Sequence, residues 1–200
     1  MRQKPISHIS HLILINFVAP IYYKLLFLYC KLKFFFTQLA IELFFLPMRP
    51  SFDDIYIDLA KTLAERSHCV KIKVGTVLTK ETRIVSVGYN GPPAGTHNCD
   101  VEWPIEGCPR DSKGGCSLAL HAEQNAIIYA SKNNVSLENC TIYVTLSPCL
   151  SCARIIFASG IKKVIYLNSY AEYKGLKNDE GIDFLQCFGI EIVRYNKGNR

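Results

Sequence analysis

Outside its first 47 residues the sequence has almost no excess of charge of either sign. Residues 1–47 hold five of the 23 basic residues and one of the 17 acidic residues, which leaves 18 basic and 16 acidic residues in 48–200. A domain that binds nucleic acid usually concentrates a clear basic excess on one face. The near balance therefore gives no indication of a nucleic-acid partner.

The sequence also has no uninterrupted apolar run long enough to be a clear membrane span. Residues 1–47 are rich in Leu, Ile, Phe and Tyr, but Lys24, Lys31 and Lys33 break the runs, and a spanning helix needs about 20 apolar residues. The segment lacks an amphipathic period, capping signals and the small-residue cleavage site of a signal peptide. We therefore interpret Met48 as the true start of the protein, with a membrane segment as the alternative and no membrane contact for residues 48–200.

Residues 48–200 contain no internal repeat and instead alternate between helical and strand patterns. Ser51 can cap a helix that reaches about Arg66. Short β-branched runs joined by a polar turn predict a hairpin of strands 74–78 and 84–88. The remaining pattern predicts helices 121–131, 149–159 and 179–187 and strands 141–145, 163–167 and 190–194. This alternation predicts an α/β fold of three layers (α/β/α), with a mixed, mostly parallel sheet between helices and the hairpin at one edge.

Nine cysteines are many for 200 residues, and their odd number and grouping favour metal ligands over a disulfide framework. Two of them form a C-x-x-C pair. Four others lie in or before residues 89–117, a stretch rich in Gly and Pro that predicts a long irregular loop. Because thiolate ligands persist in reducing compartments, we expect a cytoplasmic protein.

The C-x-x-C pair, Cys149 and Cys152, lies at a predicted helix start. Ser147 and Pro148 are residue types preferred at the N-cap and at the first helical position. Both cysteines would then lie in the first turn, where the helix dipole stabilises thiolates. A lone C-x-x-C pair is also compatible with a redox or structural role, so the rest of the pattern decides.

His121 and Glu123 complete the pattern H-x-E…P-C-x-x-C, which is typical of zinc-dependent nucleobase deaminases. With His121, Cys149 and Cys152 as ligands, Zn²⁺ keeps one open position and supplies an activated water at neutral pH. Glu123 lies about 200° round a regular helix from His121. It is therefore expected to be the catalytic residue that moves protons, and not a fourth ligand.

Five segments resemble the deoxycytidylate (dCMP) deaminase family of the cytidine-deaminase-like fold: Val74–Val77, Gly88–Pro92, His121–Ala126, Thr145–Cys149 and Ser159–Val164. The likeness covers nearly all of 48–200 and supports a start at Met48. It implies a sheet of about five strands, hydrolysis of dCMP to dUMP and ammonia for dTMP precursor supply, and a homo-oligomer, often a hexamer. It also implies regulation by deoxynucleoside triphosphates near Gly88–Pro92.

The resemblance further implies contacts with the substrate, at Asn90, Ala122, Ser147 and Tyr170. Asn90 matches a family asparagine that contacts the nucleoside, although from the residues alone a role in a turn is almost equally open. Tyr170 and Lys174 follow a predicted strand at its carboxyl end, where ligands collect in α/β folds. We expect a 5′-phosphate contact there, with an ordinary solvated loop as the alternative.

A second, structural zinc is the remaining expectation. Some members of the family carry one, with cysteines that match Cys69 and Cys99 and with histidines that have no match here. Cys108 and Cys116 could replace those histidines and close a four-thiolate site. The alternatives are buried free thiols, or a site completed by His68 or His97.

Two other functions are compatible with the motifs. A tRNA adenosine deaminase shares H-A-E and P-C-x-x-C, but it would favour a basic face, which the charge balance does not indicate. A zinc-stabilised, non-catalytic accessory protein would have no need of Glu123.

The interpretation of Met48 generates the first testable prediction. A chain that begins at Met48 should be soluble and should keep full deaminase activity, because residues 1–47 carry none of the motif residues. Activity and solubility would be compared with those of the 200-residue chain, and mass spectrometry of the native protein would identify its first residue. Loss of activity on truncation, or native protein that carries residues 1–47, would contradict this interpretation.

Overall fold

The computed structural model describes residues 19–44, 49–102, 108–112 and 115–197. The chain divides into two units at the Arg49–Pro50 junction. The first unit contains α2 (Ala19–Phe44), whose side chains at 21–38 are exposed. None of the described helices is long and apolar enough to cross a membrane. The expected start at Met48 lies outside the described residues.

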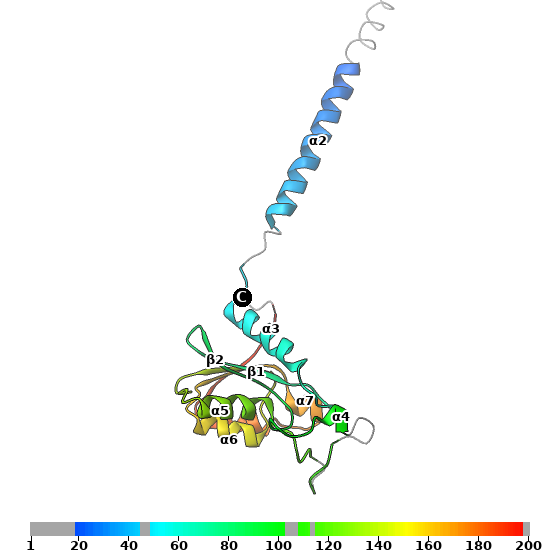
Figure 1. The fold of residues 1–200 in the computed structure, drawn as a ribbon. Helices are drawn as coiled ribbons and strands as arrows, with labels where there is room; N and C mark the ends of the chain where they lie inside the picture. The colour runs from blue at the N-terminus through cyan, green and yellow to red at the C-terminus, as the bar shows by residue number, and fades with distance from the viewer. Residues whose placement is uncertain (1–18, 45–48, 103–107, 113–114, 198–200) are drawn as a thin grey trace, which may run out of the picture. The chain divides into compact units, whose positions relative to one another are not determined.

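The second unit is built on a five-stranded sheet (Figure 1). Its strands are β1 (Gly75–Lys80), β2 (Arg83–Tyr89), β3 (Thr141–Leu146), β4 (Lys163–Asn168) and β5 (Glu191–Arg194), in the order β2-β1-β3-β4-β5. β1 is antiparallel to both β2 and β3, whereas β3, β4 and β5 are parallel. The mixed five-stranded sheet is confirmed, but only two of its four pairings are parallel, because the hairpin also pairs with β3 in the antiparallel sense.

Helices cover both faces of this sheet. α3 (Phe52–Ala64) lies on one face, and α5 (Ala122–Lys132) and α6 (Leu150–Ala158) lie on the other (Figure 1). α8 (Glu180–Cys187) joins the second layer, where Leu185 shares a core with residues of α5 and α6. The expected α/β/α arrangement is therefore confirmed. Two short helices were not predicted: α4 (Cys99–Glu102) within the expected irregular loop, and α7 (Tyr170–Lys174) after β4.

The alternation of side chains along β1, β3 and β4 produces two separate cores. The strand register places three apolar side chains side by side toward α5, α6 and α8, namely Leu78, Ile142 and Val164. Their sequence neighbours point toward α3, namely Val77, Tyr143 and Ile165. Because successive strand residues face opposite sides, one sheet fills both cores. β3 pairs with a strand on each side and is buried along almost its whole length.

The start of α3 agrees with the predicted cap. The Ser51 hydroxyl accepts a hydrogen bond from the Asp54 N–H at 3.1 Å, and the Asp54 carboxylate accepts one from the Ser51 N–H at 2.9 Å. This reciprocal pair is a capping box. The Tyr143 hydroxyl donates to Asp53 at 2.7 Å, which ties the first turn of α3 to the centre of the sheet.

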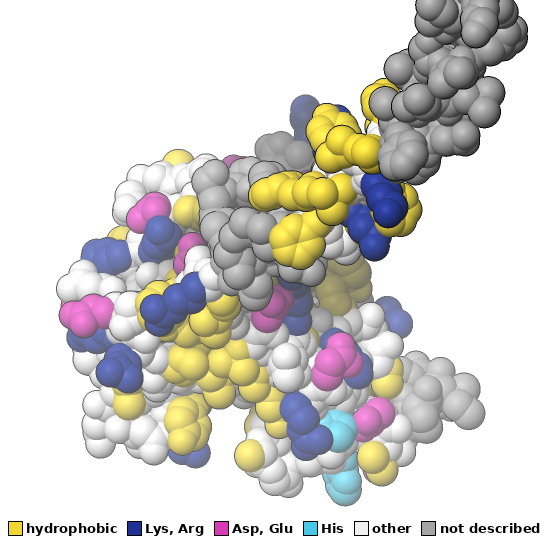
Figure 2. Space-filling view, turned by 90° about the horizontal axis from the view of Figure 1, so that it is seen from above, with side chains coloured by type: hydrophobic (Ala, Val, Ile, Leu, Met, Phe, Trp, Pro, Cys, Tyr) yellow, Lys and Arg dark blue, Asp and Glu magenta, His cyan; other side chains and the backbone are white. Residues whose placement is uncertain are grey.

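Charged side chains of both signs are interspersed on the face of the molecule shown in Figure 2. No single group of Lys and Arg side chains dominates that view. The distribution agrees with the near balance of charge in residues 48–200.

Gly88 in β2 brings α5 unusually close to the sheet, and it generates a prediction about stability. A Cβ atom at Gly88 would overlap the Ala122 carbonyl oxygen and lie 2.8 Å from the Ala126 nitrogen. Because both are backbone atoms, Gly88→Ala should displace the start of α5 and cost about 1–3 kcal/mol of unfolding free energy. Denaturant unfolding would measure this cost.

Gly91→Ala is the matched control, since a Cβ there meets no atom within 4 Å. Equal stability of the Gly88→Ala variant and the wild type would show that α5 does not need this close approach.

Candidate functional site

The two cysteines of the C-x-x-C pair lie where the central strand β3 passes into α6. Cys149 is the N-cap of α6, with extended φ −67° and ψ 165°, and Cys152 lies buried in the first turn. The prediction that Ser147 is the N-cap and Pro148 the first helical residue is wrong by two positions. The Ser147 N–H donates to the Asn168 carbonyl at 2.8 Å and its hydroxyl donates to Asp179, so Ser147 continues the extended chain and does not cap the helix.

His121 is held at the start of α5 by a short bridge to the loop after β2. Leu120 and Gly91 exchange two backbone hydrogen bonds, of 3.1 and 2.9 Å. His121 follows directly as the N-cap of α5, and its N–H donates to the Gln124 side chain at 2.8 Å. Two helix starts from distant parts of the sequence therefore converge on one point.

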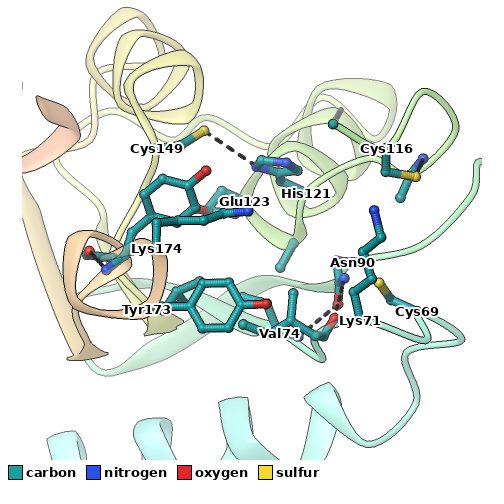
Figure 3. A pocket seen from close by; sticks show the side chains of 17 residues that line it. Cys69, Lys71, Val74, Asn90, Cys116, His121, Glu123, Cys149, Tyr173 and Lys174 are labelled. Atoms are coloured by element: carbon teal, nitrogen blue, oxygen red, sulfur yellow. Dashed lines mark hydrogen bonds between the residues drawn. The ribbon is translucent and has the colours of Figure 1, made fainter. Parts of the chain in front are cut away.

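The three converging side chains have the geometry of a zinc site. The His121 Nδ1 atom lies 3.5 Å from Cys149 Sγ and 3.3 Å from Cys152 Sγ, and all three ligand atoms lie within 4.8 Å of one another (Figure 3). Tetrahedral zinc, with bonds of about 2.3 Å to sulfur and about 2.0–2.1 Å to nitrogen, separates such N and S atoms by about 3.6 Å. The donor set and its spacing therefore fit Zn²⁺ with three protein ligands.

The two thiols of this site influence each other strongly. The hydrogen bond with Cys152, helped by His121, lowers the pKa of the Cys149 thiol to about 4. The same hydrogen bond and burial raise the pKa of Cys152. The two thiols therefore have opposite pKa shifts, and a bound cation would displace the protons that they hold.

Glu123 lies beside these ligands but outside their group. Its side chain is 4% exposed, and it is not among the three residues whose ligand atoms converge. Burial, opposed by the positive charge of His121, raises the pKa of the carboxyl to about 7. A carboxyl group that can gain and lose a proton near neutral pH suits general acid–base catalysis.

Every residue for which a substrate contact was expected lines one pocket beside this centre: Asn90, Ala122, Ser147, Tyr170 and Lys174. The Asn90 side chain is already engaged, because its Nδ2 donates to the Ile72 carbonyl at 2.9 Å and its Oδ1 accepts from the Val74 N–H at 2.8 Å. One N–H and one lone pair of this amide are left for a ligand. Asn90 therefore lines the pocket and also holds the backbone of Ile72 and Val74 in place in the pocket wall.

The pocket also contains two polar side chains that the sequence pattern did not single out, Lys71 and Tyr173. Figure 3 shows Lys71 and Asn90 on one side of the pocket and Tyr173 and Lys174 on the other. The Lys174 ammonium lies 5.5 Å from the centre of the Tyr173 ring. Lys71 precedes β1 in an irregular segment, and no local pattern relates it to α7, which is about 100 residues away in the sequence.

The four cysteines expected to hold a second zinc are neighbours, but they do not form a closed site in this structure. Cys99 and Cys108 are buried, and Cys69 and Cys116 are half-buried. Burial and the nearby thiols Cys116, Cys108 and Cys69 raise the pKa of Cys99 to about 11. Within the described ranges, the one group of three or more potential ligands close enough for a metal is that of His121, Cys149 and Cys152.

The two histidines considered for that second site have other partners. His68 Nδ1 lies 2.8 Å from the Asp100 carboxylate, and His97 Nδ1 lies 3.8 Å from that of Glu102. Both acidic partners belong to α4, and the contacts leave the four thiols as the remaining candidate ligands.

Comparison with known proteins places this site in a family. Residues 50–168 match the profile of the cytidine and deoxycytidylate deaminase zinc-binding region. Deoxycytidylate deaminase of Saccharomyces cerevisiae is 40% identical over 154 residues, covering 74% of this chain and 46% of the relative. The Schizosaccharomyces pombe enzyme is 36% identical over 154 residues, covering 74% and 45%. The chain thus spans about half the length of these two yeast relatives.

A phage relative is matched over most of its length. Deoxycytidylate deaminase of Enterobacteria phage T2 is 36% identical over 177 residues, covering 72% of this chain and 92% of the relative. The solved structure of dCMP deaminase from cyanophage S-TIM5, in complex with dCMP and dUMP, is 32% identical with a TM-score of 0.60, covering 74% of this chain and 99% of that one. The resemblance found in the sequence is confirmed: the chain belongs to the cytidine and deoxycytidylate deaminase family of zinc-binding proteins.

Proposed function

We propose that this protein catalyses the hydrolytic deamination of dCMP to dUMP, with release of ammonia, and so supplies the precursor of dTMP. The observation that carries the proposal is the buried Glu123 carboxyl beside three converging zinc ligands at the inner end of a pocket. The relatives named deoxycytidylate deaminase, and the dCMP and dUMP in the cyanophage structure, support this choice of substrate.

The residues of the site divide the chemical work. His121, Cys149 and Cys152 would hold Zn²⁺, which when bound supplies an activated water and polarises the reacting centre. Glu123 takes a proton from the attacking water, passes it to the pyrimidine ring nitrogen and then helps to protonate the departing amine. Its burial keeps bulk water away from this proton, and its position outside the ligand group leaves it free to move the proton.

We infer that the phosphate of dCMP binds at the outer part of the pocket. Lys71 and Lys174 supply two cations from separate elements, and Tyr170 and Tyr173 supply hydroxyl donors beside them. A phosphate monoester carries about −1.5 to −2 charges at neutral pH and prefers such donors. This arrangement would favour a nucleotide over the free nucleoside.

We infer that the protein is a homo-oligomer, such as the hexamer that the family resemblance implies, and that deoxynucleoside triphosphates regulate it from the loop at Gly88–Pro92. The support is a second cavity that lies between this loop and α5, lined by Tyr129 and Lys132 among others. Lys132 gives it a cation for a phosphate. All nine cysteines are free thiols, as is usual for a protein that acts in the reducing cytoplasm.

A substrate panel tests the proposed function. dCMP, CMP, deoxycytidine, dCTP and a tRNA anticodon stem would be assayed for ammonia release, and dCMP should have the highest kcat/KM because only it combines the deoxyribose with a single phosphate. Activity on the tRNA stem alone would favour adenosine deamination, and no activity on any substrate would favour the accessory-protein alternative.

Glu123→Gln tests the assigned proton transfer within the same panel. Gln has the same shape but cannot carry the proton, so turnover should fall at least ~10²-fold while zinc stays bound. Metal analysis and kcat measure the two effects. Exposed Glu138→Gln is the matched control and should behave like the wild type. Near-normal turnover in Glu123→Gln would remove Glu123 from the mechanism.

We propose in addition that Cys69, Cys99, Cys108 and Cys116 bind a second, structural zinc. Metal analysis should give two zinc ions per chain, falling to one in Cys108→Ser or Cys116→Ser, with a lower melting temperature because metal binding orders the loop. Exposed Cys187→Ser is the control and should keep both. One zinc per chain with a fully occupied active site would rule the second site out.

A further inference from the structure

One carboxylate outside the pocket joins two loops that form it. Asp179, the residue before α8, accepts hydrogen bonds through a single oxygen, Oδ2, from the hydroxyls of Ser147 at 2.5 Å and Ser169 at 3.1 Å. Both serines are buried, at 2% and 8% exposed. The Ser147 distance is in the range of short O–H···O⁻ bonds, which are about twice as strong as neutral hydrogen bonds.

The two serines belong to the loops at the carboxyl ends of neighbouring parallel strands. Ser147 follows β3 and leads to the ligand Cys149, while Ser169 follows β4 and is the N-cap of α7. The Ser147 hydroxyl also accepts the Tyr170 N–H at 2.7 Å. Ser147 therefore binds the first residue of α7, and Asp179 joins Ser147 to Ser169, the N-cap of α7.

The position of Asp179 is itself fixed by close packing. Gly181, two residues later in α8, lies so near the metal-binding loop that a Cβ atom there would overlap the Pro148 carbonyl oxygen and lie 2.9 Å from the Cys149 carbonyl carbon. The first turn of α8 thus rests on the backbone that carries Cys149. A glycine is needed at this contact because any side chain would push the two segments apart.

The second anchor of α7 lies on the surface. Glu172 accepts two hydrogen bonds from the Arg194 guanidinium, at 2.7 and 2.8 Å, and both side chains are exposed. Exposed ion pairs contribute little to stability, because water screens the two charges. The buried hydrogen bonds of Asp179 are therefore the stronger restraint on α7.

We propose that Asp179 is a positioning residue for substrate binding: it holds α7, with Tyr173 and Lys174, at a fixed distance from the metal-binding loop. Asp179 does not line the pocket, whereas Tyr170, Tyr173 and Lys174 do. Its effect is exerted through these residues on the phosphate-bearing end of the nucleotide. The inference rests on the proposed function, since it assumes a nucleotide that spans from the metal to α7.

The test separates binding from chemistry in the full-length protein. In Asp179→Ala both serines lose their acceptor. α7 keeps the Tyr170–Ser147 bond and its surface ion pair but loses its link through Asp179, so KM for dCMP should rise roughly tenfold. The metal ligands and Glu123 are untouched, so kcat and zinc content should stay near the wild-type values. A merely structural role would instead lower the melting temperature and the active fraction, which reduces kcat and leaves KM unchanged.

Three further variants keep the result interpretable. Asp179→Asn retains an oxygen for both hydroxyls and places its amide group where Oδ1, a buried atom with no hydrogen-bond partner among the described residues, now lies. It should restore most of the lost affinity. Ser169→Ala removes one of the two bonds to Asp179 together with the cap of α7, so it should also raise KM, which provides a test even if Asp179→Ala does not fold. Exposed Asp183→Ala, on the same helix, should match the wild type.

Unchanged KM in both Asp179→Ala and Ser169→Ala, or a fall in kcat that follows loss of zinc, would overturn the proposal. Absence of dCMP turnover in the wild type would instead contradict the proposed function, so the two failures are distinguishable.

Discussion

The pairing of β3 with a strand on each side is the constraint on which the rest of the site depends. β3 is hydrogen-bonded to both β1 and β4 and is covered by helices on both faces. These contacts fix the position and direction in which the chain leaves β3 at Leu146, and so they restrict its path. That path brings Cys149 and Cys152 to the start of α6. A metal ligand needs its donor atom within a few tenths of an ångström of an ideal position, and a central strand supplies that precision better than a loop.

The remaining parts of the site are attached to this strand through neighbouring elements. The Gly91–Leu120 bridge fixes His121, and the close contact of Gly88 with α5 brings Glu123 to the same point. On the parallel side, β4 ends next to β3, so α7 forms the opposite wall of the pocket. Catalytic and binding groups thus come from both halves of the mixed sheet: antiparallel strands position the His121–Glu123 helix, and parallel strands position the thiols and α7.

The pKa shifts of the site residues follow from this packing. Removing Glu123 from water raises its pKa, while the hydrogen bond with Cys152 lowers the pKa of the Cys149 thiol. Among the described residues that line the pocket, Lys71 and Lys174 are exposed cations and Glu123 is the one acid. The same cavity therefore combines a buried carboxyl group with a part that carries two cations, an arrangement that fits the charged nucleotide proposed as substrate.

The sequence by itself determined the layers of the fold and the three residues that converge, His121, Cys149 and Cys152. These depend on short-range signals: strand and helix periodicity, the Ser51 cap, and motif residues two or three positions apart. The sequence placed the start of α6 two residues too early, because the Ser147 hydroxyl has a partner, Asp179, that is 32 residues away. The antiparallel β1–β3 pairing and the roles of Lys71 and Tyr173 were decided only by tertiary structure. Each depends on contacts between segments that are distant in the sequence, and a local sequence pattern carries no information about such contacts.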